Sequence, residues 1–272
     1  MKLAVIPARG GSKRVPRKNI RPFCGRPMLA WSVAAAQASG CFDRIVVSTD
    51  DEEIARTARE AGAEVPFLRP AALSGDHVGT IAVIRHAIEA LLPAPGHGDL
   101  VCCRYATAPF VQPDDLRASL TRLAALGDAD FALAVCAFPA PIQRALRLDV
   151  DGRVSMFDPA QNSRRSQDLE PAFHDAGQFC WGRAPAWMTV TNVFTPACLA
   201  HPLPPHRVQD IDTPEDWARA EWMFRAQGLD AGAGESEGSP AESTDVDAGY
   251  APLVVFVTAY EQYAIDAFES AA

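Results

Sequence analysis

The chain has 272 residues, 48% of them hydrophobic, and a formal net charge of −9. This length allows one α/β domain of ordinary size with a substantial core and a small extra lobe. No apolar run approaches the roughly 20 residues that cross a bilayer, and the first residues lack the charged and apolar regions of a secretory signal. We therefore expect a cytoplasmic protein whose partners include neither a membrane nor a nucleic acid.

The acidic charge is confined to one part of the chain. Residues 229–272 contain nine of the 34 Asp and Glu residues and no Lys or Arg, so residues 1–228 balance 25 acids against 25 bases. Within this balanced part, residues 1–42 contain eight basic residues and no acid. A basic segment without acids favours an anionic ligand.

Buried-strand patterns alternate with helical patterns along the first half of the chain. This alternation is typical of a doubly wound, mostly parallel α/β sheet of the Rossmann-like kind. The patterns predict strands at about 2–7, 44–49, 64–68, 99–106 and 130–137, and helices near 27–38, 52–61, 79–92 and 113–126.

Local signals mark several element boundaries. Asp50 followed by Glu53 predicts a capping box at the start of a helix, and Gly40 suits the end of the helix before it. Thr213 before a proline predicts the start of a late helix that ends at Gly228. We therefore expect the main domain to cover residues 1–228.

Three segments depart from this alternation. Between about 141 and 182 the pattern changes to short strands and turns, which predicts a small inserted hairpin lobe. Residues 229–249 are rich in Gly, Ala, Ser, Glu and Asp, which predicts an acidic disordered linker. Residues 250–272 resemble one strand-helix unit of a response-regulator receiver domain, and we expect this orphan fragment to have no signalling role.

The strongest chemical signal is the segment AVIPARGGSKRVPRKN at residues 4–19. A predicted strand leads into Gly10 and Gly11, whose amides can approach phosphates closely. Arg9, Lys13 and Lys18 add positive charge that would offset the charge of about −4 on a triphosphate. The segment is neither a P-loop nor a dinucleotide-binding GxGxxG. A basic surface loop is the alternative interpretation.

The whole segment resembles the signature of the CMP-nonulosonate synthetases, the CMP-sialic acid synthetase family of nucleotidyltransferases. The resemblance covers residues 1–228, and each further matching motif follows the end of a predicted strand, where open α/β sheets bind ligands. It implies a CTP-dependent cytidylyltransferase. The matching motifs are Ser48-Thr49-Asp50, Phe67-Leu68-Arg69-Pro70, Thr107-Ala108-Pro109 and Gln209-Asp210-Ile211-Asp212-Thr213.

The resemblance also implies which residues act on CTP. Ser12 and Asn19 equally suit turns, and Arg69 equally suits a surface charge beside an extended kink. Catalytic roles fall on Arg9, Lys13, Lys18 and Asp212. CTP binding is expected from Ala8, Arg9, Gly10, Gly11, Ser12, Lys13, Lys18, Asn19 and Arg69.

Asp210 and Asp212 form the predicted metal site. They lie two residues apart, so on a strand both carboxylates would face the same side and could bind a hard divalent ion. A D-x-D pair alone equally fits solvated carboxylates. In the family this pair holds Mg²⁺ at the triphosphate, and we therefore expect Mg²⁺ as the cofactor.

The sugar site rests on two segments that resemble the pseudaminic acid branch of the family, residues 164–170 and 173–179. Arg165 would pair with the sugar carboxylate, a bidentate task that suits a guanidinium. His174 equally suits a polar position in a hairpin. The family's Gln-Pro-Thr-Ser-Pro loop reads YATAP here at residues 105–109, which is a departure. The predicted sugar contacts are Tyr105, Thr107, Gln143, Arg165, His174 and Gln178.

The expected reaction is transfer of CMP from CTP to the anomeric hydroxyl of pseudaminic acid, with release of pyrophosphate. N-acetylneuraminic, legionaminic and 3-deoxy-octulosonic acids are alternative substrates. A non-catalytic nucleotide-binding or regulatory protein, and an inactive chimera, are alternatives from other classes. The partners implied by the resemblance are CTP, a nonulosonic acid and a second copy of the chain in a homodimer.

Overall fold

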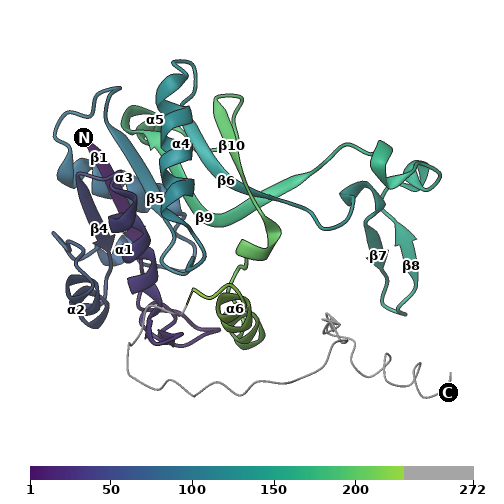
Figure 1. Ribbon diagram of the computed structural model, residues 1–272, viewed down its shortest axis with the longest axis horizontal. Coiled ribbons are helices and arrows are strands. Elements are labelled where there is room, and N and C mark those ends of the chain that lie inside the picture. The colour runs from purple at the N-terminus through teal and green to yellow at the C-terminus, as the bar shows by residue number, and fades with distance from the viewer. Residues whose placement is uncertain (230–272) are drawn as a thin grey trace, which may run out of the picture. The chain divides into compact units, whose positions relative to one another are not determined.

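The computed structural model describes residues 1–229. The predicted acidic linker, apart from residue 229, and the receiver-like fragment at 250–272 lie outside these residues. A six-stranded sheet in the order β10-β6-β9-β5-β1-β4 forms the centre of the domain (Figure 1). Its strands are β1 (Lys2–Pro7), β4 (Arg44–Ser48), β5 (Leu100–Arg104), β6 (Phe131–Ala137), β9 (Phe173–Arg183) and β10 (Cys198–Leu203).

The sheet is mostly parallel, as the sequence predicts. Strand β1 pairs in parallel with β4 on one side and with β5 on the other, and β6 pairs in parallel with β10. Strand β9 lies between β5 and β6 and runs antiparallel to both. The parallel strands have almost continuous apolar sequences because both faces of the sheet are covered.

Helices cover both faces of the sheet (Figure 1). Successive residues of β1 serve opposite faces: Leu3 and Val5 pack in the cluster that includes Ile84 of α3, whereas Ile6 packs with Leu29 of α1 and Ile54 of α2. The helices are α1 (Met28–Ser39), α2 (Glu52–Glu60), α3 (Thr80–Leu91), α4 (Pro113–Ala125), α5 (Ala184–Thr189) and α6 (Pro214–Ala226).

Shorter elements complete the described chain. Strands β2 (Pro22–Phe23) and β3 (Arg26–Pro27) form one small antiparallel pair, and β7 (Leu146–Leu148) and β8 (Val154–Met156) form another. The 3₁₀ turns are η1 (Ala71–Leu73), η2 (Ile142–Arg144), η3 (Pro159–Gln161), η4 (Ser166–Asp168) and η5 (Pro205–Arg207).

The helix boundaries confirm most of the predicted signals. Gly40 follows α1 with φ 63°, the left-handed conformation that glycine adopts without strain, and Thr213 caps α6. The predicted capping box at Asp50 is wrong, because the N-cap of α2 is Asp51, whose carboxylate accepts from the amides of Glu53 and Ile54. Asp50 is thereby left available for contacts outside the helix.

Two strand predictions also differ from the structure. Residues 64–68 form only two isolated bridges to β4 and its end, rather than a strand. The predicted insert at 141–182 ends earlier, because residues 173–182 belong to β9 in the middle of the main sheet. The chain leaves the sheet at Phe138, whose amide donates to the carbonyl of Ala172, and we call residues 138–172 the lobe.

The lobe carries the predicted hairpin. Strands β7 and β8 pair through residues 146–148 and 154–156, and Gly152 in the turn between them has φ 77°. In Figure 1 the lobe projects away from the main sheet at the ends of β6 and β9. No helix in residues 1–229 is both long enough and apolar enough to span a membrane.

Candidate active site

The candidate site lies at the point where the order of the strands in the sheet reverses. After β1 the chain adds β4 on one side of it, and it later adds β5 on the other side. The carboxyl ends of β1 and β5 therefore border the crevice at which open α/β sheets bind ligands. A pocket of about 390 Å³, a volume typical of small-molecule sites, lies here and is called the switch-point pocket. It is lined by Pro7, Arg9, Ser12, Lys13, Arg14, Lys18, Asn19, Asp76, Tyr105, Ala106, Thr107 and Asp212.

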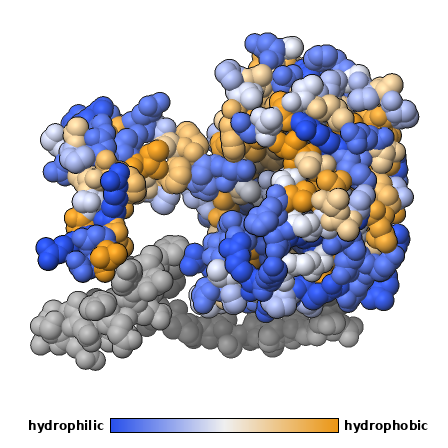
Figure 2. Space-filling model, turned by 180° about the vertical axis from the view of Figure 1, so that it is seen from behind, coloured by the Kyte–Doolittle hydropathy of each residue, from blue (hydrophilic) through white to orange (hydrophobic). Residues whose placement is uncertain are grey.

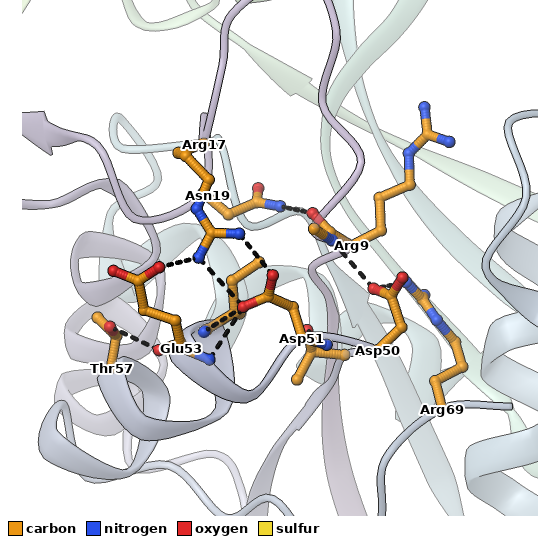
Figure 3. Close-up of polar contacts among 11 residues, drawn as sticks. Arg9, Arg17, Asn19, Asp50, Asp51, Glu53, Thr57 and Arg69 are labelled. Carbon is orange, nitrogen blue, oxygen red and sulfur yellow. Dashed lines mark hydrogen bonds and ion pairs between the residues drawn. The ribbon is translucent and has the colours of Figure 1, made fainter. Parts of the chain in front are cut away.

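Residues 8–19, which we call the phosphate loop after their predicted ligand, are held in place from two sides (Figure 3). The amide of Gly10 donates to Asp50 Oδ1 at 3.0 Å, and Asn19 Nδ2 donates to the carbonyl of Arg9 at 2.9 Å. A Cβ atom at Gly10 would lie 2.7 Å from Asp51 Oδ2, so this close approach requires glycine. Gly11 has open space around it. The predicted Gly-Gly turn is thus packed on one side and open on the other.

Two cations of the phosphate loop share one carboxylate. Arg9 Nη1 and Lys13 Nζ each lie 2.5 Å from an oxygen of Asp76, which lies between η1 and α3. Hydrogen bonds from Lys13 and then from Arg9 lower the pKa of Asp76 below its ordinary value. Asp76 is therefore ionised at neutral pH, and it contacts the two cations that are expected to bind the phosphates.

The other cations of the pocket surround Asp212. Lys18 Nζ donates to the carbonyl of Ile211 at 2.6 Å and lies 3.2 Å from Asp212 Oδ1. Arg14 Nη2 donates to Asp212 Oδ2 at 2.7 Å. Arg14 was not among the predicted site residues, although it belongs to the basic segment without acids. This arrangement joins the phosphate loop to the chain just before α6.

The two predicted metal ligands lie close in sequence but line different hollows. Residues 208–212 form no strand, and Asp212 lines the switch-point pocket while Asp210 lines a neighbouring pocket of about 330 Å³ that also includes His174. Burial and then the charge of Asp212 raise the pKa of Asp210. Within residues 1–229 no group of three or more His, Cys, Asp or Glu is placed to hold a metal. The strand expected to set both carboxylates on one side is therefore absent from residues 208–212. Asp212, in the switch-point pocket, still fits Mg²⁺, which takes most of its ligands from substrate phosphates and water, and Asp210 is close enough for its pKa to respond to the charge of Asp212.

Arg69 is held beneath the phosphate loop, and Figure 3 shows it beside Asp50. Its side chain is buried, and its guanidinium lies 3.6 Å from Asp50 Oδ1, the atom that accepts from Gly10. Burial lowers the pKa of Arg69 and the charge of Asp50 partly opposes this. Ala8 is also buried. Asp50 thus connects Arg69 to the phosphate loop.

The six predicted sugar contacts do not come together in one pocket. Tyr105 and Thr107 line the switch-point pocket, and His174 lines the neighbouring one. Gln178 is 2% exposed, and its amide donates to the carbonyl of Arg207 at 2.6 Å. Gln143 and Arg165 lie in the lobe, where they contact the Glu170 carbonyl and the Asp168 carboxylate.

The fold and the pocket together define a nucleotidyltransferase. A doubly wound sheet places a glycine turn, several cations and a carboxylate at its switch point, which suits a nucleoside triphosphate. A family model described as cytidylyltransferase matches residues 3–177. The chain belongs to the cytidylyltransferase family.

Sequence comparison finds relatives in bacteria and in an animal. The chain is 43% identical over 223 residues to the pseudaminic acid cytidylyltransferase of Campylobacter jejuni, a match that covers 82% of this chain and 96% of that protein. It is 31% identical to the CMP-N,N′-diacetyllegionaminic acid synthase of Legionella pneumophila, over 82% of this chain and 95% of that one. It is 32% identical to N-acylneuraminate cytidylyltransferase B of Danio rerio, over 80% and 50%.

Solved structures confirm the fold. The structure of CMP:2-keto-3-deoxy-manno-octonic acid synthetase complexed with CTP superposes with a TM-score of 0.62 at 15% identity, over 83% of this chain and 99% of that one. The 4-diphosphocytidyl-2C-methyl-D-erythritol synthase of Anaerococcus prevotii gives 0.54 at 13% identity, over 82% and 98%. These similarities show a shared architecture.

Proposed function

We propose that the protein transfers CMP from CTP to the anomeric hydroxyl of pseudaminic acid and releases pyrophosphate. The observation that carries the proposal is the 43% identity to a pseudaminic acid cytidylyltransferase across 96% of that protein's length. The 31% identity to a CMP-legionaminic acid synthase over a similar span also supports transfer of CMP to a sugar acid, but this relative is less similar. The substrate proposal therefore follows the more similar relative.

The residues of the switch-point pocket suit this reaction. The hydroxyl oxygen attacks the α-phosphorus, the bond to the bridging oxygen breaks, pyrophosphate leaves and the hydroxyl proton passes to solvent. Arg9, Lys13 and Lys18 would neutralise charge on the phosphate oxygens, so that catalysis rests on positioning and electrostatics. Asp210 and Asp212 would hold Mg²⁺, which when bound adds positive charge at the triphosphate.

We also propose a cytoplasmic homodimer. The buried cysteines, Cys102 and Cys103 among them, are free thiols, as is usual in a reducing compartment. Leu148 and Val154 lie opposite each other in the lobe hairpin and are 73% and 65% exposed. Figure 2 shows apolar patches on this lobe. Exposed apolar clusters mark interaction sites, and a second copy of the chain would cover this one.

The proposal is tested with CTP, Mg²⁺ and one nonulosonic acid at a time. Pseudaminic, legionaminic and N-acetylneuraminic acids are offered separately, and pyrophosphate release and the mass of the product are measured. Turnover of pseudaminic acid with a kcat/KM well above that of the others supports the proposal. Preference for another acid would overturn the substrate, and no turnover with any of them would overturn the reaction.

A further inference from the structure

Residues 105–109, the first part of the connection from β5 to α4, contribute to one wall of the switch-point pocket. Tyr105, Ala106 and Thr107 all line the pocket. The loop has no regular secondary structure, and only its first amide, that of Tyr105, joins a ladder-like hydrogen bond, to the carbonyl of Gln178 at 3.0 Å. The rest of its shape must be fixed by side chains beneath it.

Arg104 lies beneath this loop at the end of β5 and is fully buried. Its Nη2 donates to the carbonyl of Ala108 at 2.8 Å, and its Nη1 donates to the carbonyls of Tyr105 at 3.3 Å and Gln178 at 3.1 Å. Ser32 of α1 contacts the same loop, with its hydroxyl 2.9 Å from the Tyr105 carbonyl and 3.1 Å from that of Ala106. The carbonyls at 105, 106 and 108 thus all have buried donors.

A buried guanidinium is a costly way to support a loop. Among residues 1–229 Arg104 has no carboxylate within ion-pair distance, and its Nε has no hydrogen-bond partner. Burial lowers the pKa of Arg104 to about 10, which still leaves the group charged at neutral pH. The carbonyls of the 105–109 loop and of β9 accept its hydrogen bonds, and the more distant charge of Asp115 also favours the charged form.

The same buried network reaches the chain that carries the two aspartates. The backbone carbonyl of Gln178 accepts a hydrogen bond from Arg104. The side-chain amide of Gln178 donates to the backbone carbonyl of Arg207. Arg207 pairs with both oxygens of Asp115 at the start of α4, at 2.5 and 3.0 Å. Arg207 lies three residues before Asp210. The network thus links two walls of the site through groups buried beneath them.

We propose that Arg104 is a positioning residue that sets the 105–109 loop in the shape the acceptor sugar requires. The inference rests on the proposed function, because it assigns the sugar to this wall of the pocket. Arg104 itself touches no substrate. The phosphate loop is held by other residues, so loss of Arg104 should affect the sugar far more than CTP.

The test compares Arg104→Met with Arg183→Met. Arg104→Met keeps an unbranched stem and removes every guanidinium donor. Arg183, at the far end of β9, also ties several backbone carbonyls together and makes no contact with the pocket, so it is a matched control. We expect Arg104→Met to raise the KM for the sugar about tenfold and to change CTP affinity less than twofold. The substitution would displace the loop that contacts the sugar, and a displaced contact positions the sugar less well. Arg183→Met should lower Tm without changing either constant.

Equal losses in sugar KM and CTP affinity, or the same sugar defect in Arg183→Met, would overturn the proposal. If Arg104→Met does not fold, Ser32→Ala and Arg104→Lys each remove fewer donors from the carbonyls of the 105–109 loop and should give a smaller defect of the same kind. Hydrogen exchange of residues 100–112 gives a readout without substrate, and it should quicken in Arg104→Met alone. If the wild type turns over no sugar, the proposed function fails, while unchanged exchange in Arg104→Met separately refutes the positioning role.

Discussion

Asp76 is a carboxylate that contacts two of the cations predicted to bind the triphosphate. Its two oxygens lie against Arg9 and Lys13, the cations that a phosphate would need. Both ion pairs are at least partly exposed, so each is worth little in water and is readily exchanged. Asp76 therefore pairs with both cations only weakly, so a phosphate can displace it.

Replacing Asp76 by Asn should therefore tighten CTP binding by about 3-fold to 10-fold, because the amide keeps the shape and removes the competing charge. Calorimetric titration with CTP measures the change. Asp128→Asn, an exposed carboxylate after α4, is the control and should bind CTP as the wild type does. Weaker CTP binding in Asp76→Asn would contradict this account and make Asp76 a ligand of the nucleotide complex.

The residues predicted for the phosphate loop share a local signal that also includes the missed Arg14, whereas Asp76 has no such signal. The phosphate loop stands out because its glycines and cations are adjacent in sequence. Asp76 lies more than 60 residues away from Arg9 and Lys13 and reaches them through the turn after Pro70, which no local pattern reveals. Gln178 looked like a contact residue, and its burial follows from the central position of β9.

At the scale of elements, Asp115 ties α4 to the turn before the two aspartates. It caps α4 through the amide of Gln112 and pairs with Arg207 of η5. Burial by itself would raise the pKa of Asp115, but the nearby His201 and hydrogen bonds from Arg207 and the Gln112 amide lower it well below its ordinary value. The ionised form is therefore the one that the fold stabilises.

Asp115→Asn should cost about 3 kcal/mol of unfolding free energy at pH 7, because it leaves the Arg207 charge partly buried and unpaired. A carboxylate with a lowered folded-state pKa contributes stability above its unfolded pKa of about 4 and loses it as the pH falls toward the folded value. The deficit should consequently be smaller at pH 3 than at pH 7. Urea unfolding at both pH values measures it.

Asp114→Asn is the matched control, since this neighbouring carboxylate is exposed and should change stability little at either pH. A deficit for Asp115→Asn that stays the same at pH 3 would contradict the charge-based explanation. It would point instead to the shape of the cap.

Helices and strands were predicted correctly where the hydrophobic period and the capping residues indicate the same element. They were missed where tertiary contacts determine the local structure. Residues 130–137 and 113–126 match β6 and α4 closely, since each has a long uniform pattern. Asp50 and Asp51 are equally good caps in sequence, and the amide of Gly10 recruits Asp50 to the phosphate loop. Strand β9 escaped prediction because His174, Asp175 and Gln178 interrupt its apolar pattern and its pairing with β6 contains a register shift.

At the scale of the whole molecule, the lobe is the feature that a single chain does not explain. Its two-stranded hairpin has little core of its own, and hairpins of this size are marginally stable alone. The lobe also carries Gln143 and Arg165, two of the predicted sugar contacts, away from the switch-point pocket. A second copy of the chain would cover the hairpin, and its pocket would be the one that Gln143 and Arg165 contact.

The double substitution Leu148→Asp with Val154→Asp should convert a dimer to a monomer, because it places charge on both members of an exposed apolar pair. Light scattering after size-exclusion chromatography measures the mass. Ser155→Asp adds charge to a polar position of the same hairpin and should remain dimeric. A monomeric wild type, or a double variant that stays dimeric, would refute the dimer.

The most direct test of the central claim follows the α-phosphorus of CTP. The protein is incubated with Mg²⁺, pseudaminic acid and CTP labelled at that atom, and the products are separated. The account predicts that the label appears in a CMP-sugar while unlabelled pyrophosphate is released, and that Asp212→Asn nearly abolishes this transfer. Label that remains in CTP, or that appears only as free CMP, would contradict cytidylyl transfer to this sugar.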